Sequence, residues 1–218
     1  FPSEQGAVRD GYIERNGIRY VLKRVPLGSP GAPSVARLRG QVLLLAQAKP
    51  AGFPTIRSFT AHETHAEIIM DERRGIRLAE RVQRRRLTAD EVLEVALDIG
   101  HALEQLHELG ERHGAVGFDS IVAADEGGWC LCDYGECFAR VSSSRASSQR
   151  ADSTVSGHDL RVDLLGLGKV LQTCLGMLPP GEDGVQVKLA ALAATLVNDS
   201  KERTNSWRGN VPRKAFTT

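Results

Sequence analysis

The most informative segment of this sequence is residues 106–120, LHELGERHGAVGFDS, which is followed after a short interval by residues 131–135, LCDYG. The first segment contains His113, and the four residues after this histidine are Gly, Ala, Val and Gly, none of which is ionisable. An interval of 13 residues separates Ser120 from Asp133 in the second segment. The pattern combines a defined spacing with an absence of reactive side chains next to the histidine.

This pattern resembles the catalytic loop and the metal-binding turn of protein kinases, H-R-D-L-x-x-x-N and D-F-G, with the family's usual interval between them. In this register the chain keeps His113, Asp133 and Gly135. It has Ala115 in place of the base Asp, Gly117 in place of the phosphate-facing Lys, and Ser120 in place of the metal-ligating Asn. The resemblance therefore implies a degenerate member of the protein kinase-like superfamily, a pseudokinase.

Segments before this loop resemble kinase elements in the same order. Tyr20-Val21-Leu22-Lys23 resembles the V-A-I-K strand, so Lys23 is implied to be a remnant of a nucleotide pocket. Residues 35–48 have helical apolar spacing and correspond to helix αC, with Gln41 at the position of its glutamate. A Lys–Glu ion pair then becomes at most a neutral hydrogen bond, and a core helix with a surface glutamine is the alternative. Met70 corresponds to a position near the gatekeeper.

Residues 6–13 resemble a damaged G-x-G-x-x-G-x-V loop, with Val8 in place of the middle glycine. A valine Cβ obstructs the close approach of backbone N–H groups to phosphate. Only residues 1–5 precede this segment, which is too short and polar for the strand that opens such a loop. We expect an ordinary turn that leads into a strand.

The second half of the chain supplies scaffold positions. Asp163 begins a D-x-x-x-L-G pattern that resembles helix αF, whose aspartate ties the backbone of the histidine loop to the lobe core. Arg203 resembles the arginine that pairs with the A-P-E glutamate, but the chain has no A-P-E triplet, so its partner is open. Residues 138–157 correspond to the activation segment. Their Ser-rich part either accepts phosphate or is a polar loop without function.

The resemblance implies an α+β, bilobal protein kinase-like fold. Residues 1–70 would form an N-lobe with a small antiparallel sheet and no proper Gly-rich loop, and residues 71–75 the hinge. Residues 76–218 would form a helical C-lobe, which is trimmed because the interval from Asp163 to Arg203 is short.

Local patterns predict several elements independently of the resemblance. Asn16-Gly17 predicts a hairpin turn between strands at 12–15 and 18–25. A second hairpin is expected from strands at 56–61 and 66–70, and we expect His62 and His65 in its polar turn to face solvent rather than to bind metal. The remaining predictions are a helix from the capping box at Thr88 to a stop at Gly110, helices over 162–175 and 189–197, and a strand at 129–133.

The composition is that of a globular protein, with 41% hydrophobic and 25% charged residues among 218. The formal net charge is +1, so no overall field selects nucleic acid or an anionic membrane. No apolar run approaches the roughly 20 residues that span a bilayer. No nucleic-acid partner and no transmembrane segment are therefore expected, and a protein partner is expected only from the pseudokinase hypothesis stated below.

The four cysteines, Cys130, Cys132, Cys137 and Cys174, have no zinc-binding spacing. Cys130 and Cys132 share one face of the predicted strand. One of these two can form a disulfide with Cys137 or Cys174; the alternative is that the cysteines are buried free thiols.

The absence of a carboxylate at Ala115 excludes ordinary kinase catalysis, because a carboxylate must lie within reach of the substrate hydroxyl. Asp119 is the nearest carboxylate, and its use would require a rearranged loop. We therefore hypothesise a catalytically inactive pseudokinase that acts as a protein-binding, scaffolding or regulatory module. The alternative is an unorthodox nucleotide-binding phosphotransferase, or a nucleotide-sensing switch, that uses Lys23 and Asp133.

The first hypothesis expects no metal and no cofactor. ATP and Mg²⁺ enter only under the alternative, in which Asp133 is the candidate metal ligand. The joint loss of the phosphate loop and the catalytic carboxylate is also similar to divergent secreted pseudokinases of apicomplexan parasites, including the with-no-Gly-loop group. That similarity implies the secretory pathway or a parasite vacuole; otherwise a cytoplasmic protein is expected.

Overall fold

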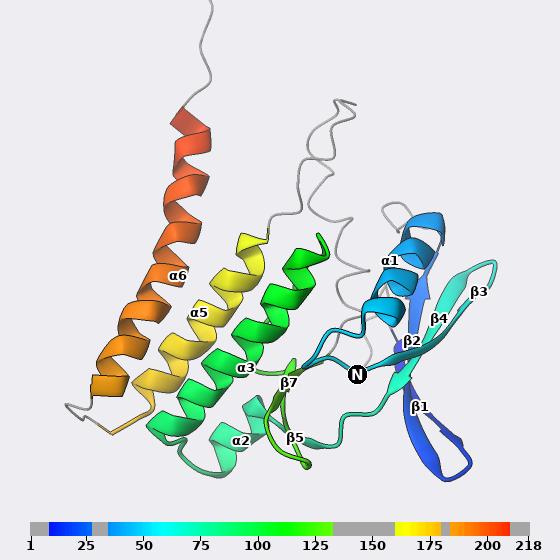
Figure 1. The fold of residues 1–218 in the computed structure, drawn as a ribbon, viewed down its shortest axis with the longest axis horizontal. Coiled ribbons are helices and arrows are strands. Elements are labelled where there is room, and N and C mark those ends of the chain that lie inside the picture. Colours follow the sequence, from blue (N-terminus) through cyan, green and yellow to red (C-terminus); the bar gives the residue numbers. More distant parts are fainter. Residues whose placement is uncertain (1–8, 28–34, 133–159, 180–183, 210–218) are drawn as a thin grey trace, which may run out of the picture.

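The computed structural model describes residues 9–27, 35–132, 160–179 and 184–209, with the backbone alone for residues 9, 10 and 199–209. Within these residues the protein is a mixed α+β structure of five helices and two small antiparallel sheets (Figure 1). The larger sheet and one helix lie at one end of the chain's fold, and three long helices lie at the other.

The larger sheet has four strands in the order β1-β2-β4-β3, and all neighbouring strands are antiparallel. The strands are β1 (Arg9–Arg15), β2 (Ile18–Pro26), β3 (Ile56–Ala61) and β4 (His65–Asp71). Helix α1 (Val35–Ala48) connects β2 to β3 and contacts β3. Both predicted hairpins and the helix over 35–48 are confirmed.

The β1–β2 turn has the backbone that its sequence predicts, because Asn16 and Gly17 have positive φ angles of 53° and 72°. The prediction that this strand begins at Tyr12 is wrong. β1 begins at Arg9, and Gly11 pairs with Leu22. The pairing of β1 with β2 includes residues 9–13 of the segment 6–13, which resembles a damaged glycine loop, so these residues form a strand. Positions 6–8 lie outside the described residues.

One face of the larger sheet is buried. On β4 the residues Ala66, Ile68 and Met70 are buried, and the residues between them are partly exposed. Buried residues of α1, namely Leu38, Val42 and Leu45, belong to the same apolar core. Val35, the first residue of the helix, is exposed.

The other elements follow β4 after a short connection. They are β5 (Gly75–Arg77), α2 (Leu78–Arg84), α3 (Ala89–Glu108), β6 (Ile121–Ala124), β7 (Trp129–Leu131), α5 (Arg161–Gly176) and α6 (Gly184–Gly209). The three short strands form an antiparallel sheet in the order β5-β6-β7. Helices α3, α5 and α6 lie side by side, with α5 in contact with both others (Figure 1).

Both predicted ends of α3 are confirmed. Thr88 caps the helix in a capping box with Glu91, and Gly110 follows the helix end with a φ of 73°. The helix predicted over 189–197 is too short, because α6 begins at Gly184 and extends through the segment that contains Arg203. Two apolar residues of these helices, Val162 in α5 and Leu192 in α6, are exposed.

Close helix packing explains one glycine in α5. A Cβ at Gly168 would lie 3.0 Å from side-chain atoms of both Leu196 and Val197 in α6. The two helices approach each other closely here because glycine has no side chain.

The cysteines of the described residues are buried and free. Cys130, Cys132 and Cys174 are free thiols, while Cys137 lies outside the described residues. Cys130 and Cys132 belong to the same small apolar cluster, although Cys132 lies just outside the strand, because β7 ends at Leu131 and not at 133 as predicted. Burial raises the pKa of the Cys174 thiol to about 11.

None of the helices in the described part of the chain has the length and apolar character needed to cross a bilayer.

The capping box also predicts a dependence of stability on pH. Burial acts to raise the pKa of Glu91, but hydrogen bonds from Arg85, the Thr88 backbone and Arg81 outweigh it and lower the pKa to about 2. A lowered pKa means that the stabilisation is complete above the unfolded-state pKa and is lost as pH falls toward the folded-state value. We expect the wild type to lose this stabilisation between pH 4.5 and pH 2.

The measurement is the melting temperature across that pH range for the wild type and Glu91→Gln. The difference in melting temperature between wild type and Glu91→Gln should be largest near neutral pH and should become smaller in acid. A gap that is independent of pH would contradict the role assigned to the Glu91 charge.

Candidate functional site

The loop between α3 and β6 is held in place by one buried carboxylate. Asp163, in the first turn of α5, is fully buried. Its Oδ2 accepts a hydrogen bond from the backbone N–H of His113 at 2.7 Å, and its Oδ1 accepts one from the N–H of Gly114 at 2.5 Å. The Nε2 of His107, on α3, lies 3.0 Å from Oδ2. Three elements, α3, the loop and α5, therefore meet at Asp163.

The charge of Asp163 is stabilised by these contacts. Burial acts to raise its pKa, but the hydrogen bonds from His107, Gly114 and His113 outweigh the burial and lower the pKa. The carboxylate is therefore the form that holds the loop.

His113 connects the loop to the end of β7. Its side chain is buried, and its Nε2 lies 2.8 Å from the carbonyl oxygen of Cys132. A carbonyl can only accept, so Nε2 carries the hydrogen and Nδ1 is left as an acceptor for the N–H of Ala115, at 3.4 Å. Both nitrogens are used in contacts with the backbone. The histidine thus has a positioning role in this loop.

A glycine of α5 allows the loop to lie against the helix. A Cβ at Gly166 would lie 2.7 Å from the carbonyl oxygen and 2.9 Å from the Cβ of Val116. Any larger residue at 166 would displace the loop backbone.

The three positions that lack reactive groups lie together in this loop. Ala115 and Gly117 offer only backbone groups, and Ser120 is buried. The Ser120 Oγ accepts a hydrogen bond from the N–H of Gly117 at 2.9 Å and lies 3.0 Å from the carbonyl oxygens of Ala115 and Gly117. The hydroxyl is therefore used within the loop itself.

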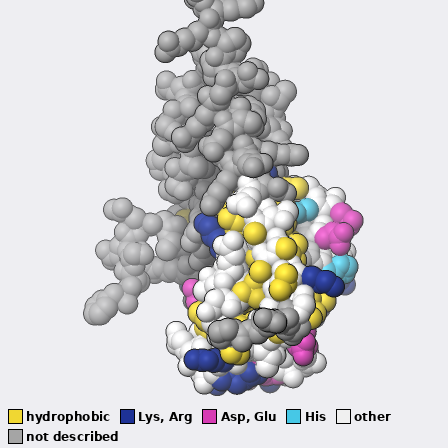
Figure 2. Space-filling model, turned by 90° about the vertical axis from the view of Figure 1, so that its left-hand side faces the viewer, with side chains coloured by type: hydrophobic (Ala, Val, Ile, Leu, Met, Phe, Trp, Pro, Cys, Tyr) yellow, Lys and Arg dark blue, Asp and Glu magenta, His cyan; other side chains and the backbone are white. Residues whose placement is uncertain are grey.

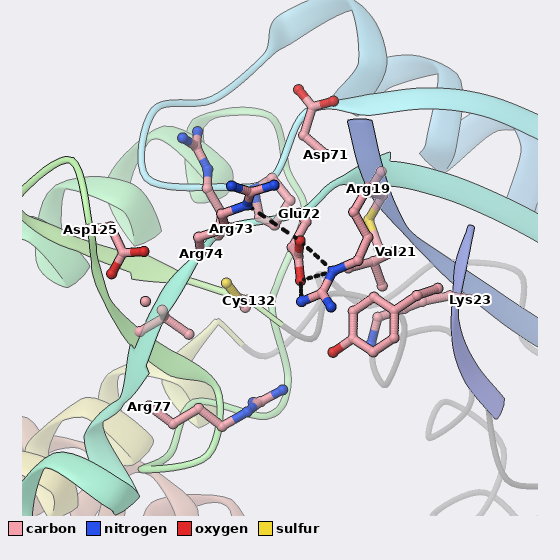
Figure 3. A pocket seen from close by; sticks show the side chains of 15 residues that line it. Arg19, Val21, Lys23, Asp71, Glu72, Arg73, Arg74, Arg77, Asp125 and Cys132 are labelled. Atoms are coloured by element: carbon pink, nitrogen blue, oxygen red, sulfur yellow. Dashed lines mark hydrogen bonds and ion pairs between the residues drawn. The ribbon is translucent and has the colours of Figure 1, made fainter. Parts of the chain in front are cut away.

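A cavity of about 370 Å³ lies between the larger sheet and the β5–β7 sheet (Figure 3). The predicted residues Lys23 and Met70 line it together with Cys132 at the end of β7. Lys23 is 2% exposed, on the buried face of β2, opposite Ile68 of β4. The structure thus brings Lys23 and Met70 to one cavity, next to the residue that precedes Asp133.

An ion pair crosses this cavity. Arg19 on β2 and Glu72, just after β4, point toward each other in Figure 3. The Arg19 Nε lies 2.8 Å and 2.7 Å from the two carboxylate oxygens of Glu72, and the guanidinium also stacks over the ring of Tyr12, 4.6 Å from its centroid. The hydrogen bond from Arg19 is the main cause of the lowered pKa of Glu72. A ligand that entered here would have to fit beside this pair or displace it.

The carboxylates that line the cavity are largely engaged. Asp71 accepts hydrogen bonds from Arg57 at 2.7 Å, and Glu72 is paired with Arg19. Asp125 is the third carboxylate of the lining. The structure therefore offers few carboxylate oxygens in this cavity for a hard cation such as Mg²⁺.

Gln41 joins α1 to the loop. Its Nε2 donates to the carboxylate of Glu111, two residues before His113. A hydrogen bond from the neutral amide of Gln41 to the carboxylate of Glu111 thus links α1 to the loop that contains His113.

Asp133, Gly135, Cys137 and the segment 138–157 lie outside the described residues, as does the side chain of Arg203.

No protein-family model matches the chain, and a search of curated proteins finds no significant match.

Arg19 and Glu111 are among the site residues that the sequence did not predict. Each meets a partner more than 50 positions away, Glu72 and Gln41 respectively. The Arg19–Glu72 contact depends on the register of β2 against β4, in which Tyr20 is paired with Asp71. A correct strand pairing would have placed Arg19 near the connection after β4, but no local pattern marks it.

Proposed function

We propose that this chain is a catalytically inactive protein kinase-like module, a pseudokinase, that acts by binding other proteins. In this proposal the sheet with α1 corresponds to an N-lobe over residues 1–70. Residues 71–75 correspond to the hinge, and residues 76–218 to a trimmed helical C-lobe. The four-stranded antiparallel sheet with its single helix, and the layer of helices α3, α5 and α6, support this division.

The observation that carries the proposal is the contrast within one loop. Asp163 and His113 hold the loop backbone by hydrogen bonds, as a scaffold requires. The positions where phosphoryl transfer needs a base, a cation and a metal ligand hold Ala115, Gly117 and Ser120. Transfer depends on positioning and on charge stabilisation, so a well-positioned loop without those groups supports binding rather than turnover.

The surface of the helical part supports a role in protein binding. Figure 2 shows the side of the molecule on which α6 lies, where hydrophobic side chains gather. Met177, Val187 and Leu192, at the end of α5 and on α6, are exposed, Val187 by 64%. Exposed apolar patches on a protein commonly mark sites of protein–protein contact.

A second candidate is a nucleotide-binding switch, and the cavity next to Lys23 favours it. Its volume of about 370 Å³ falls within the range of about 300–1,000 Å³ that is typical of ligand sites. Lys23, Arg74 and Arg77 line it, and cations of this kind suit an anionic ligand. Asp133 would contribute the metal ligand in this candidate function.

The test that separates the two candidates combines a melting curve with a transfer assay. We expect the wild type to show no rise in melting temperature with ATP and Mg²⁺, and no transfer of the γ-phosphate to itself or to a general protein substrate. A ligand that binds the folded state would raise the melting temperature in proportion to ln(1 + [L]/Kd), so saturating ATP makes the absence of a shift informative.

Lys23→Met and Lys169→Met form the matched pair of variants. Lys23 is buried in the cavity wall, whereas Lys169 is exposed on α5. A nucleotide-dependent shift that disappears in Lys23→Met and persists in Lys169→Met would favour the switch. Consumption of ATP on top of that shift would contradict the inactive module.

A further inference from the structure

The turn between β3 and β4 places two histidines and a glutamate on one face of the sheet. His62 and His65 flank the two-residue turn, and the N–H of His62 donates to the carbonyl of His65 at 2.8 Å. Residues that close a hairpin in this way lie opposite each other, with side chains on the same face. Glu67 is two residues beyond His65, so it shares that face. Ala66 and Ile68 point to the core, which leaves this trio on the solvent side.

The side chains of this trio converge. The two imidazole rings stack, with centroids 4.6 Å apart and planes inclined by 18°. The Nε2 of His62 lies 3.6 Å from Oε2 of Glu67, and the Nε2 of His65 lies 3.6 Å from Oε1. One donor atom from each of the three residues can be chosen so that all lie within 4.8 Å of one another.

Contrary to the expectation from the sequence that the two histidines do not bind metal, we propose that His62, His65 and Glu67 form a binding site for a divalent transition metal ion, with Zn²⁺ as the best-fitting ion. This site is independent of the function proposed for the loop and the cavity. It lies at the start of β4, whereas the cavity residues Met70 and Asp71 lie at its end; the nearest pair, Glu67 and Met70, is about 10 Å apart along a strand that rises about 3.4 Å per residue.

The distances fit a shared ion better than direct hydrogen bonds. Hydrogen bonds from ring nitrogens to oxygens span about 2.7–3.2 Å, so separations of 3.6 Å are too long. Two ligand atoms on one tetrahedral zinc, each about 2.0–2.2 Å from the ion, lie about 3.3–3.6 Å apart. The two nitrogen–oxygen separations fall at the upper end of that range, although they run to different carboxylate oxygens, and one ligand atom from each residue lies within 4.8 Å of the others. Rotation of the side chains is needed to bring both nitrogens and one oxygen to the same ion.

The surrounding contacts orient the ligands. The Nδ1 of His65 lies 3.2 Å from the Thr64 hydroxyl, which can accept its hydrogen and leave Nε2 with a free electron pair. Arg24 donates to Oε1 of Glu67 at 2.9 Å, and this hydrogen bond fixes the direction of the carboxylate beside the two rings. Two neutral imidazoles and one carboxylate form a ligand set known for zinc, with a fourth position open to water.

The experiment is a titration of the full chain with ZnCl₂ at pH 7.5, followed by calorimetry or by competition with a coloured chelator. We expect one equivalent to bind to the wild type. His62→Ala, His65→Ala and Glu67→Gln should each weaken binding by at least about tenfold, because loss of even an outer contact to a metal ligand commonly costs 10–100-fold. Replacement of zinc by Co²⁺ should give the strong visible absorption of a tetrahedral site, and that absorption should be lost in the same variants.

His101→Ala is the matched control. His101 is an exposed histidine whose Nδ1 lies 3.4 Å from a carboxylate oxygen of Glu104, but the described residues give it no third ligand within the same reach. Its replacement should leave zinc affinity unchanged.

Three results would overturn the proposal. The first is that the wild type binds no zinc. The second is that the double variant His62→Ala with His65→Ala binds zinc with unchanged affinity and stoichiometry. The third is that His101→Ala weakens binding as much as the trio variants do. Glu67→Gln keeps the shape of the side chain, so it remains informative if a histidine variant alters the hairpin. Circular dichroism of each variant without metal verifies that the fold is retained.

Discussion

Replacement of Asp163 by asparagine is expected to lower the free energy of unfolding by about 3–5 kcal/mol, the range found when one partner of a buried charged group is removed. Both carboxylate oxygens accept backbone hydrogen bonds, Oδ2 from His113 and Oδ1 from Gly114. An asparagine of the same shape offers one oxygen and one NH₂ group, so one backbone donor would face another donor. His107 would also lose its charged partner.

This loss should depend on pH in a defined direction. The pKa of Asp163 is lowered in the folded protein, so its stabilisation is present above the unfolded-state pKa of about 3.9 and is lost as pH falls through the lower folded-state value. The difference in stability between wild type and Asp163→Asn should therefore be largest near neutral pH and shrink in acid. Urea denaturation at pH 7 and at successively lower pH values measures it.

Asp119→Asn is the control for this prediction. Asp119 belongs to the same loop, undergoes the same chemical change and is exposed. Its replacement should change stability by no more than about 0.5 kcal/mol, as is usual for surface positions. Equal effects of the two substitutions, or a neutral Asp163→Asn, would show that the buried carboxylate does not hold the loop.

The elements that the sequence predicted well are those whose causes are local. The Asn16-Gly17 turn depends on the φ angles that these two residues tolerate, and the start of α3 depends on Thr88 and Glu91, which lie three positions apart. In both cases the interaction that determines the structure lies within a few residues. A pattern in the sequence can therefore indicate it.

The elements that the sequence did not predict depend on distant partners. β5 and β6 have three and four residues, and each becomes a strand because it pairs with its neighbour in the small sheet. Strand β1 starts earlier than its own pattern indicates because β2 offers a longer edge. The length of α6 was missed for the opposite reason, since its second half is polar and shows no apolar periodicity.

The site shows the same division. Lys23 and Met70 were expected in one pocket, and both line the cavity. The role of Ser120 was not expected, because its hydroxyl bonds to the loop backbone only once the loop has its folded shape. The Arg19–Glu72 pair depends on strand register, which no single segment of the sequence encodes.

Gly75→Ala is expected to destabilise the fold by about 3–5 kcal/mol, because it combines backbone strain with a steric clash, each of which costs about 1–3 kcal/mol. Gly75 has a φ of 151°, which L-residues rarely adopt. A Cβ added there would lie 2.0 Å from the carbonyl oxygen of Ala123 and 3.0 Å from the Cα of Ala124. Both contacts are with the backbone of β6, so no side-chain rotation can relieve them.

Because of its position, a substitution at Gly75 is expected to disrupt the whole β5–β7 sheet and not only its own residue. It begins β5, directly after the connection from β4, and it lines the same cavity as Lys23. Relief of the clash requires β5 to move away from β6. That movement would break the small sheet at the point where the chain passes from the larger sheet to the helices. We expect a fall in melting temperature of about 6–20 °C, since about 2–4 °C corresponds to 1 kcal/mol in a chain of this size.

Gly40→Ala provides the matched control, because it is the same substitution with the opposite expected sign. Gly40 lies within α1, and a Cβ there would meet no atom within 4 Å. Alanine should stabilise the helix by about 0.8–1.0 kcal/mol. Thermal denaturation of the two variants beside the wild type tests both signs at once. If Gly75→Ala has the same melting temperature as the wild type, β5 does not approach the β6 backbone this closely, and the description of that side of the cavity is wrong.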